Sequence, residues 1–352
     1  MRVMRTITRL VALGLIVTAC SGEAEPVETT TSTTEPTTTT APAVTTTTAA
    51  PTPTTTEAPV VSPINGLPVD DPQLLGRRVL AVKIDNHPRA RPQSGIEQAD
   101  MVIEMMVEGI TRFISIWLQS DSEYLGPNRS GRPTDSTLLP AFNNPTFVIS
   151  GAQGWVQQMI RAKGISMIKE LSPGTFRIGG RSAPHNLYVN TIELRAHADN
   201  QGYPDEPPAG PIWEFGPMLE DATPASVVRI DFSGNSVVWT WDAEEMLWLR
   251  TASGSESTWR DVEGETGRIG VPVLVALYTE QYSVNGLPAS QTVGSGQALV
   301  FAEGRVVTGT WSRESETEWF ALTDQNGESI QVPPGKVWVS LVPANRGLTF
   351  EG

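Results

Sequence analysis

Apolar runs along the chain predict strands more often than helices. Residues 77–85, RRVLAVKID, are typical of one buried strand. Residues 99–120 are typical of two strands around a tight turn at Glu108-Gly109, and residues 145–151, PTFVISG, predict another strand. The first part of the folded chain should therefore contain a sheet.

Three segments between and after these strands carry helical signals. Residues 134–144, TDSTLLPAFNN, predict a short helix with Thr134 or Asp135 as its N-cap. Residues 154–165 have apolar side chains at helical spacing up to a glycine, and residues 190–202 begin at a capping residue and end at a glycine. Helices that alternate with strands predict a mixed sheet with covering helices.

The chain after residue 224 is richer in strands. β-Branched and aromatic runs are separated there by Gly, Asn and Asp, and Asn326-Gly327 is typical of a hairpin with a type I′ turn. Trp239 and Trp241 have the alternating spacing of core side chains. The predicted fold class is α+β: a mixed sheet with covering helices in the first domain, then a strand-rich, mainly antiparallel second domain.

The N-terminal segment carries a targeting signal. Arg2, Arg5 and Arg9 precede a short apolar run that ends in VTAC, the order of a bacterial lipoprotein signal peptide whose cleavage exposes Cys20. Acylation of Cys20, with palmitate among the expected chains, would anchor the protein in the cell membrane on its extracytoplasmic side. Threonine, proline and alanine dominate the residues that follow, so we expect a disordered tether.

Shifts in composition divide the chain into six parts. A segment rich in proline, glycine and acidic residues separates the two strand-bearing regions and predicts a linker. The predicted parts are a signal peptide (1–19), a disordered tether (20–62), an α/β domain (63–203), a linker (204–224), a strand-rich domain (225–345) and a tail (346–352).

Charge is distributed unevenly over these parts. The formal net charge of the chain is -14, yet residues 77–195 hold 14 Lys/Arg and 10 Asp/Glu, a net of +4. An acidic chain with one mildly basic region argues against nucleic acid as its partner. It leaves room for a local site that binds an anion.

Three loops carry side chains suited to such a site. The first follows the strand at residues 77–85, the second is GPNRSGRPTD (126–135), and the third is GGRSAPHNLYV (179–189). Arginine offers a planar fork for carboxylate or phosphate, and Asp85, Glu104 and Glu108 are expected to orient the arginines. The candidate ligand-binding residues are Asp85, Asn86, His87, Arg89, Arg91, Glu108, Arg112, Arg129, Ser130, Arg132, Arg181, His185 and Asn186.

Four motifs in order resemble the YerB-like bacterial lipoproteins. They are VKIDNHPRARPQSG, ADMVIEMMVEGITRF, GPNRSGRP and RSAPHNLY, and the segments VGSGQALVFAEGRVVTGTWSR and DQNGESIQVPPGKVWVSLVP resemble the family's C-terminal part. The resemblance covers nearly all of residues 64–343. It implies a lipid-anchored, extracytoplasmic protein with two α/β parts, and it supplies no reaction.

The loop residues favour binding over catalysis. We expect the partner to be an anionic cell-envelope ligand or a cell-envelope protein, in either case related to peptidoglycan. We expect neither a cofactor nor a metal. A second hypothesis is a wall-directed hydrolase or transferase in which His87 or His185 acts as general base. Ser130 or Ser182 would then be its nucleophile. A third is a regulatory partner of an envelope enzyme, docking through the acidic second half.

Overall fold

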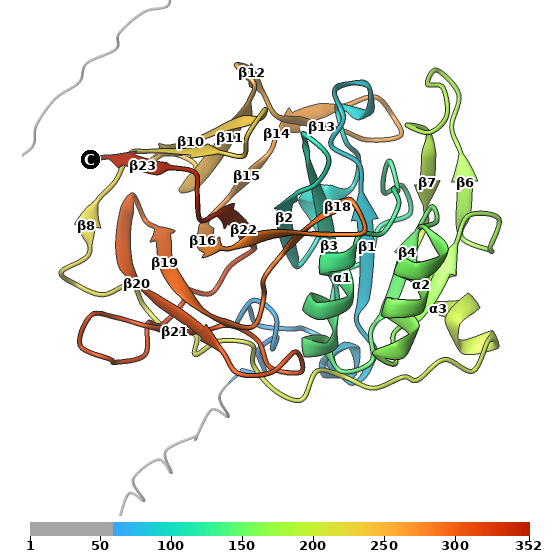
Figure 1. Ribbon diagram of the computed structural model, residues 1–352, viewed down its shortest axis with the longest axis horizontal. Helices are drawn as coiled ribbons and strands as arrows, with labels where there is room; N and C mark the ends of the chain where they lie inside the picture. Colours follow the sequence, from blue (N-terminus) through green and yellow to red (C-terminus); the bar gives the residue numbers. More distant parts are fainter. Residues whose placement is uncertain (1–58) are drawn as a thin grey trace, which may run out of the picture. The chain divides into compact units, whose positions relative to one another are not determined.

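An eleven-stranded mixed sheet is the main element of residues 59–352, which are the residues that this computed structural model describes (Figure 1). The predicted signal peptide and Cys20 lie outside the described residues. In spatial order the strands are β21 (Ala321–Thr323), β20 (Arg305–Arg313), β19 (Gly294–Ala302), β16 (Val273–Thr279), β22 (Val337–Pro343), β2 (Met101–Met106), β3 (Thr111–Trp117), β1 (Leu80–Ile84), β4 (Thr146–Ile149) and β5 (Ser166–Lys169), and β8 (Thr223–Pro224) pairs with β20.

The middle of this sheet joins strands that are far apart in the sequence. β2 pairs in parallel with β22, with Met101 opposite Val337 and Met105 opposite Leu341. β22 pairs in parallel with β16 on its other side. The predicted mixed sheet is therefore present, and strands from both sides of the predicted linker are hydrogen-bonded into it.

A smaller antiparallel sheet packs against one face of the main sheet, and both contribute to one apolar core. Its strands in order are β12 (Ser255–Glu256), β11 (Leu247–Ala252), β10 (Ser236–Asp242), β9 (Val227–Asp231) and β23 (Leu348–Glu351), with β15 (Gly270–Val271) paired to β11. Three two-stranded ribbons complete the strands: β6 (Thr175–Arg177) with β7 (Leu187–Val189), β13 (Thr258–Arg260) with β14 (Thr266–Arg268), and β17 (Gln281–Val284) with β18 (Leu287–Ser290).

The helices are few and short, and they gather beside the β1–β5 end of the main sheet (Figure 1). Helices α1 and α2 pack into the core on one face of the sheet, and α3 packs into the core on the other. The predicted covering by helices is therefore limited to this end. The α-helices are α1 (Pro133–Leu138), α2 (Gly154–Ala162) and α3 (Thr191–Asn200), and the 3₁₀ helices are Pro72–Gly76, Pro88–Ala90, Ile96–Gln98 and Leu139–Phe142.

Two local predictions are corrected by side-chain contacts. Neither Thr134 nor Asp135 is the N-cap of α1: the carboxylate of Asp135 lies inside the first turn and accepts from the Arg132 N–H at 2.6 Å. The 324–328 turn is not type I′, because Gly327 has a positive φ of 83° and Asn326 does not. The Asp324 carboxylate sets this turn instead by accepting from the Asn326 N–H at 2.8 Å.

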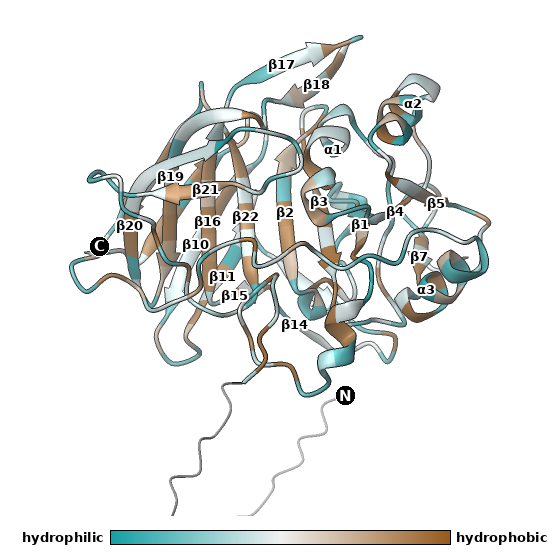
Figure 2. Cartoon of the chain, turned by 90° about the horizontal axis from the view of Figure 1, so that it is seen from below, coloured by the Kyte–Doolittle hydropathy of each residue, from teal (hydrophilic) through white to brown (hydrophobic). Residues whose placement is uncertain are grey.

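Both faces of the main sheet are buried, which explains the continuous apolar runs of its central strands. Figure 2 shows these strands as predominantly hydrophobic, with hydrophilic residues at the loops. Trp239, Trp248 and Trp338 are buried between the two sheets, and the rings of Trp239 and Trp338 meet edge to face at 5.2 Å. Trp239 is thus a core side chain, as its spacing predicts.

The ends of the predicted tether and linker are packed onto the fold. Ser62 is buried, and its N–H donates to the carbonyl of Leu67 at 2.9 Å. Trp213, in the linker, is also buried, and its indole N–H donates to the carbonyl of Phe320 at 2.8 Å. Within residues 59–352, no helix has the length and apolarity needed to cross a membrane.

A buried ion pair connects the main sheet to the smaller one. The guanidinium of Arg250 on β11 lies 2.6 Å from the carboxylate of Glu104 on β2, and both side chains are almost fully buried. The rings of Phe113, Trp239 and Trp338 surround the guanidinium at 5.3 to 5.9 Å. The indole N–H of Trp338 also donates to Glu104, at 3.1 Å.

We expect Arg250→Met to lower the free energy of unfolding by about 3–5 kcal/mol, because it leaves the Glu104 carboxylate buried without its counter-charge. Denaturant unfolding of the full-length chain measures this loss. Arg229→Met is the control, since Arg229 and Glu351 form an exposed pair at 3.4 Å whose removal should cost no more than about 1 kcal/mol. Equal losses in the two variants would contradict the role of the buried pair.

Candidate functional site

The three polar loops meet beyond the carboxyl ends of β1 and β4. These strands run parallel, so Asp85 after β1 and Ser150 after β4 emerge at the same edge of the sheet. The second loop passes between them: the Arg129 N–H donates to the Lys83 carbonyl at 2.8 Å, and the Arg129 carbonyl accepts from the Ser150 N–H at 3.1 Å. Backbone hydrogen bonds therefore fix the second loop against the first.

Asp85 is the point at which side chains from all three loops converge. Its carboxylate is fully buried, and Oδ2 lies 2.7 Å from Nδ1 of His185 and 3.4 Å from Nε of Arg129. Oδ1 accepts from the backbone N–H of His87 at 3.0 Å. The rings of His87 and His185 are stacked with their centroids 4.5 Å apart. A single carboxylate thus orients a histidine and an arginine from two other loops.

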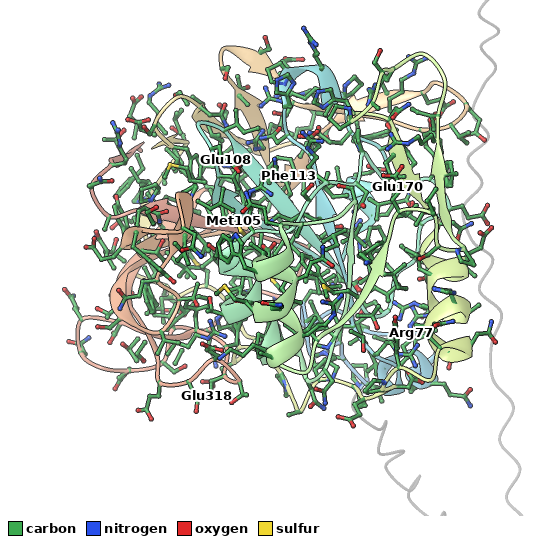
Figure 3. The ribbon with its side chains drawn as sticks, turned by 45° about the vertical axis from the view of Figure 1, so that its right-hand side comes forward. Arg77, Met105, Glu108, Phe113, Glu170 and Glu318 are labelled. Carbon is green, nitrogen blue, oxygen red and sulfur yellow. The ribbon has the colours of Figure 1, made fainter. Side chains whose placement is uncertain are left out.

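Arginine side chains crowd the same end of the sheet. Arg132 holds Glu108, at the tip of the β2–β3 hairpin (Figure 3), through contacts of 2.7 and 2.6 Å. Arg112 lies 3.9 Å from Glu108 and donates to the carbonyl of Ser130 at 3.0 Å. Burial and the charges of Arg132 and Arg129 lower the pKa of Arg112 to about 10. Among the described residues, the buried Nε atoms of Arg112 and Arg129 have no hydrogen-bond partner.

A second buried ion pair lies close to these arginines. Nζ of Lys83 is 2.6 Å from Oδ1 of Asp135, and both side chains are fully buried. Burial lowers the pKa of Lys83 to about 8, although the charge of Asp135 acts in the opposite direction. The Asp135 carboxylate is therefore engaged by Lys83. Lys83 is not among the residues predicted for the site, because it stands within an apolar strand.

Positive charge exceeds negative charge in this cluster. Arg112, Arg129 and Arg132 have ion-pair contacts with the carboxylates of Asp85 and Glu108, and Asp85 is shared with His185. Three guanidinium groups therefore face two carboxylates. An anion placed among them would be attracted by the uncompensated charge.

A cavity of about 440 Å³ opens beside the histidine pair. Arg89, residues 180–184 and His185 line it. Arg181 forms part of its wall because its guanidinium donates to two carbonyl oxygens of the first loop, at 3.0 and 2.7 Å. Arg89 is exposed, and its side chain forms neither a hydrogen bond nor an ion pair with any described residue. Its guanidinium is free to meet a ligand.

Three of the predicted ligand-binding residues hold the loops together. Oδ1 of Asn86 accepts from Nε of Arg91 at 2.9 Å, and Nδ2 of Asn86 donates to the hydroxyl of Thr111 at 2.7 Å. Oδ1 of Asn186 accepts from Arg177, and Nδ2 of Asn186 donates to two carbonyls of its own loop. These polar atoms are used within the chain, so Asn86, Arg91 and Asn186 act on the site through the loop backbone.

The prediction that Glu104 orients the loop arginines is wrong, because Glu104 is paired with Arg250. Thr111 connects this pair to the first loop: its hydroxyl donates to Glu104 at 2.6 Å and accepts from Asn86 at 2.7 Å. Neither Arg250 nor Thr111 is among the residues predicted for the site. The available signal is an arginine among the apolar positions of residues 247–252, where a charge has to be paired.

Two family models match the chain over most of its described length. The N-terminal domain of "Protein of unknown function (DUF3048)" matches residues 64–204, and the C-terminal domain of the same family matches residues 228–339. The chain belongs to the DUF3048 family. Its predicted resemblance to YerB-like lipoproteins is confirmed by the two relatives that follow.

Both relatives come from Bacillus subtilis. "Putative lipoprotein YerB" of strain 168 is 28% identical over 296 residues, which are 80% of this chain and 86% of that protein. The crystal structure of YerB has a TM-score of 0.72 at 25% identity and covers 82% of this chain and 99% of that one. This chain and YerB of Bacillus subtilis thus have similar folds at low sequence identity.

We expect His87 to titrate below its ordinary pKa of 6.5. Burial lowers its pKa, and the charge of neighbouring His185 lowers it further. The unfolded chain then binds more protons than the folded chain just below pH 6.5, so the His87 contribution to stability is present above this pH and is lost as the pH falls. An NMR titration of the full-length chain, with the His87 signal assigned by His87→Asn, measures the pKa. A value above 6.5 would contradict the geometry.

Proposed function

We propose that this chain is a lipid-anchored, extracytoplasmic binding protein that holds an anionic cell-envelope ligand at the three loops around Asp85. The observation that carries the proposal is the uncompensated positive charge of these loops in a chain of net charge -14. Arg112 keeps a buried Nε atom without a partner among the described residues, and a carboxylate or phosphate would supply the missing acceptor.

The membrane anchor rests on the sequence and on a relative. VTAC at residues 17–20 follows a basic and then an apolar segment, and this order supports Cys20 as the acylated residue. The similar protein from Bacillus subtilis carries the name of a lipoprotein. A lipid on Cys20 supports an envelope location and an envelope ligand, such as a stem-peptide carboxylate of peptidoglycan or a phosphorylated wall precursor.

The Asp85 contacts would organise the site before the ligand arrives. The buried carboxylate holds His185 at 2.7 Å and Arg129 at 3.4 Å, so neither side chain has to be ordered during binding. Fixing donors in advance lowers the entropic cost of binding. The Asp85 carboxylate contacts both His185 and Arg129. Its single negative charge therefore neutralises only part of the positive charge of the loops.

A wall-directed hydrolase or transferase is the second candidate, and the Asp85–His185 pair is what favours it. A carboxylate bonded to Nδ1 orients a histidine that acts as general base through its other nitrogen. Serine hydroxyls do not complete such a site within residues 59–352: the Ser130 hydroxyl bonds the Ser150 hydroxyl at 3.1 Å, and no serine hydroxyl bonds His87 or His185. The binding proposal therefore takes precedence. The regulatory-partner hypothesis stays a prediction.

Calorimetric titration of the full-length chain with inorganic pyrophosphate and with N-acetylmuramic acid tests the proposal. We expect at least one anion to bind, and Arg129→Gln to weaken that binding by about tenfold or more, because a charge-assisted hydrogen bond is lost. Arg161→Gln is the matched control, since Arg161 is exposed on α2 and donates to Gln157. Absence of binding to both anions, or equal losses in the two variants, would overturn the proposal.

A further inference from the structure

Three neighbouring cavities form one groove along the loops. The cavity of about 440 Å³ beside His185 shares Gly180 and Arg181 with a second cavity of about 330 Å³. The second shares Tyr124 and residues 261–262 with a third of about 230 Å³. Because each neighbouring pair has lining residues in common, the three cavities are adjacent; we call them together the groove.

The groove lies where the first and second halves of the chain meet. Arg181 and Tyr124 come from the first half, and Arg260 with residues 261–262 comes from the β13–β14 ribbon of the second half. The Arg260 N–H donates to the carbonyl of Gln93 at 2.8 Å and fixes the ribbon against the first loop. Ligand sites are common at such junctions.

The middle of the groove is aromatic. The rings of Tyr124 and Tyr188 lie 4.6 Å apart, and Phe176 lies 6.1 Å from Tyr124. Gly179 and Gly180 form the adjacent wall, and a Cβ at either position would meet nothing within 4 Å. Open space over tyrosine rings suits an uncharged segment of a ligand, since the rings offer apolar surface.

The two ends of the groove carry opposite charge. At the His185 end, Arg89 has no ion pair with a described residue, and Arg181 is bonded to carbonyls and a tyrosine hydroxyl, which leave its charge in place. At the other end, Glu97, Glu123 and Glu263 line the third cavity, and none forms an ion pair within residues 59–352. The middle cavity carries both signs of charge, Arg260 and Asp261, and the Lys336 ammonium donates to the backbone carbonyl of Glu97 at 2.5 Å, so the acidic end holds three carboxylates beside one lysine.

The side chain of Glu97, at the acidic end, has a polar atom without a hydrogen-bond partner in residues 59–352. Its Oε2 atom is buried and has no hydrogen-bond partner among the described residues. Burial raises the pKa of Glu97 because it disfavours the charged carboxylate, and a cation placed beside it would stabilise that charged form. The nearby carboxylate of Asp261 is occupied, because it accepts from the N–H groups of Gly264 and Glu265 at 2.7 Å.

We propose that the groove binds a short peptide, with a carboxylate at the Arg89 and His185 end and an ammonium group at the Glu97, Glu123 and Glu263 end. A peptide carries both charges at the ends of a largely uncharged backbone, which matches the basic, aromatic and acidic parts in order. A simple inorganic anion would leave the acidic end unused. This inference rests on the proposed function, because the basic end of the groove borders the Asp85 site.

The peptide Lys-Ala-Ala is the probe for this inference. We expect the full-length chain to bind it in a calorimetric titration, and about tenfold or greater weakening when its two amines are acetylated or its carboxylate is amidated, because either change removes one charge pairing. The double variant Glu123→Gln/Glu263→Gln should weaken binding of Lys-Ala-Ala and leave binding of the diacetylated peptide unchanged. Glu244→Gln, at an exposed turn between β10 and β11, is the control and should bind like the unaltered chain.

The outcomes separate this inference from the proposed function. Equal affinity for Lys-Ala-Ala and its diacetylated form would overturn the peptide inference and leave the anion site standing. Binding of pyrophosphate without binding of Lys-Ala-Ala would do the same. Absence of binding to Lys-Ala-Ala, pyrophosphate and N-acetylmuramic acid would overturn both. Equal binding of Lys-Ala-Ala by the double variant and the control variant would also overturn the assignment of the acidic end.

Discussion

The buried pair of Glu104 and Arg250 is the constraint on which the arrangement of the two halves depends. Two charges in an apolar core are tolerated when they stay together, because separating them leaves each without solvent or partner. Their separation would require β11 to leave β2, and the 2.6 Å contact therefore fixes the smaller sheet on the larger one. The hydroxyl of Thr111 extends the constraint to Asn86, at the start of the first polar loop.

Two kinds of charged cluster are distinguished by how completely they are paired. Glu104 with Arg250, and Lys83 with Asp135, are buried one-to-one pairs at 2.6 Å. The arginines around Asp85 are less buried and outnumber their carboxylates, so part of their charge remains available to a ligand. The first kind holds the fold together, and the second is what a binding site for anions requires. Their proximity lets a rigid interior position the arginine side chains.

Local pattern predicts the hairpins of this fold and not its long-range pairings. β2 and β3 are recognised because their turn at Glu108-Gly109 separates two adjacent apolar runs. The parallel pairing of β2 with β22 cannot be predicted in this way, because no turn joins the two strands. The apolar run of a central strand is compatible with any neighbouring strand. The short strands β6 and β7 are missed for a related reason: each has three residues, too few to show a period.

The sequence predicts which residues gather at the candidate site, and it does not predict which of them face a ligand and which hold the loops. Loops rich in arginine and histidine identify Asp85, His185 and Arg129, which do converge. The sequence does not reveal that the Asn186 amide is hydrogen-bonded within its own loop, or that the β13–β14 ribbon contributes Arg260 to the groove. Those facts follow from side-chain direction and from contacts between the two halves, which single-sequence patterns do not encode.

A crystal structure of the protein soaked with inorganic pyrophosphate tests the central claim most directly. The account predicts electron density for the anion within hydrogen-bond distance of Arg129 and of Arg89 or His185. Density confined to exposed arginines elsewhere, such as Arg229 or Arg346, would contradict it. If the anion fully occupies sites at Arg229 and Arg346 and none among the three loops, the arginines around Asp85 have a structural role only.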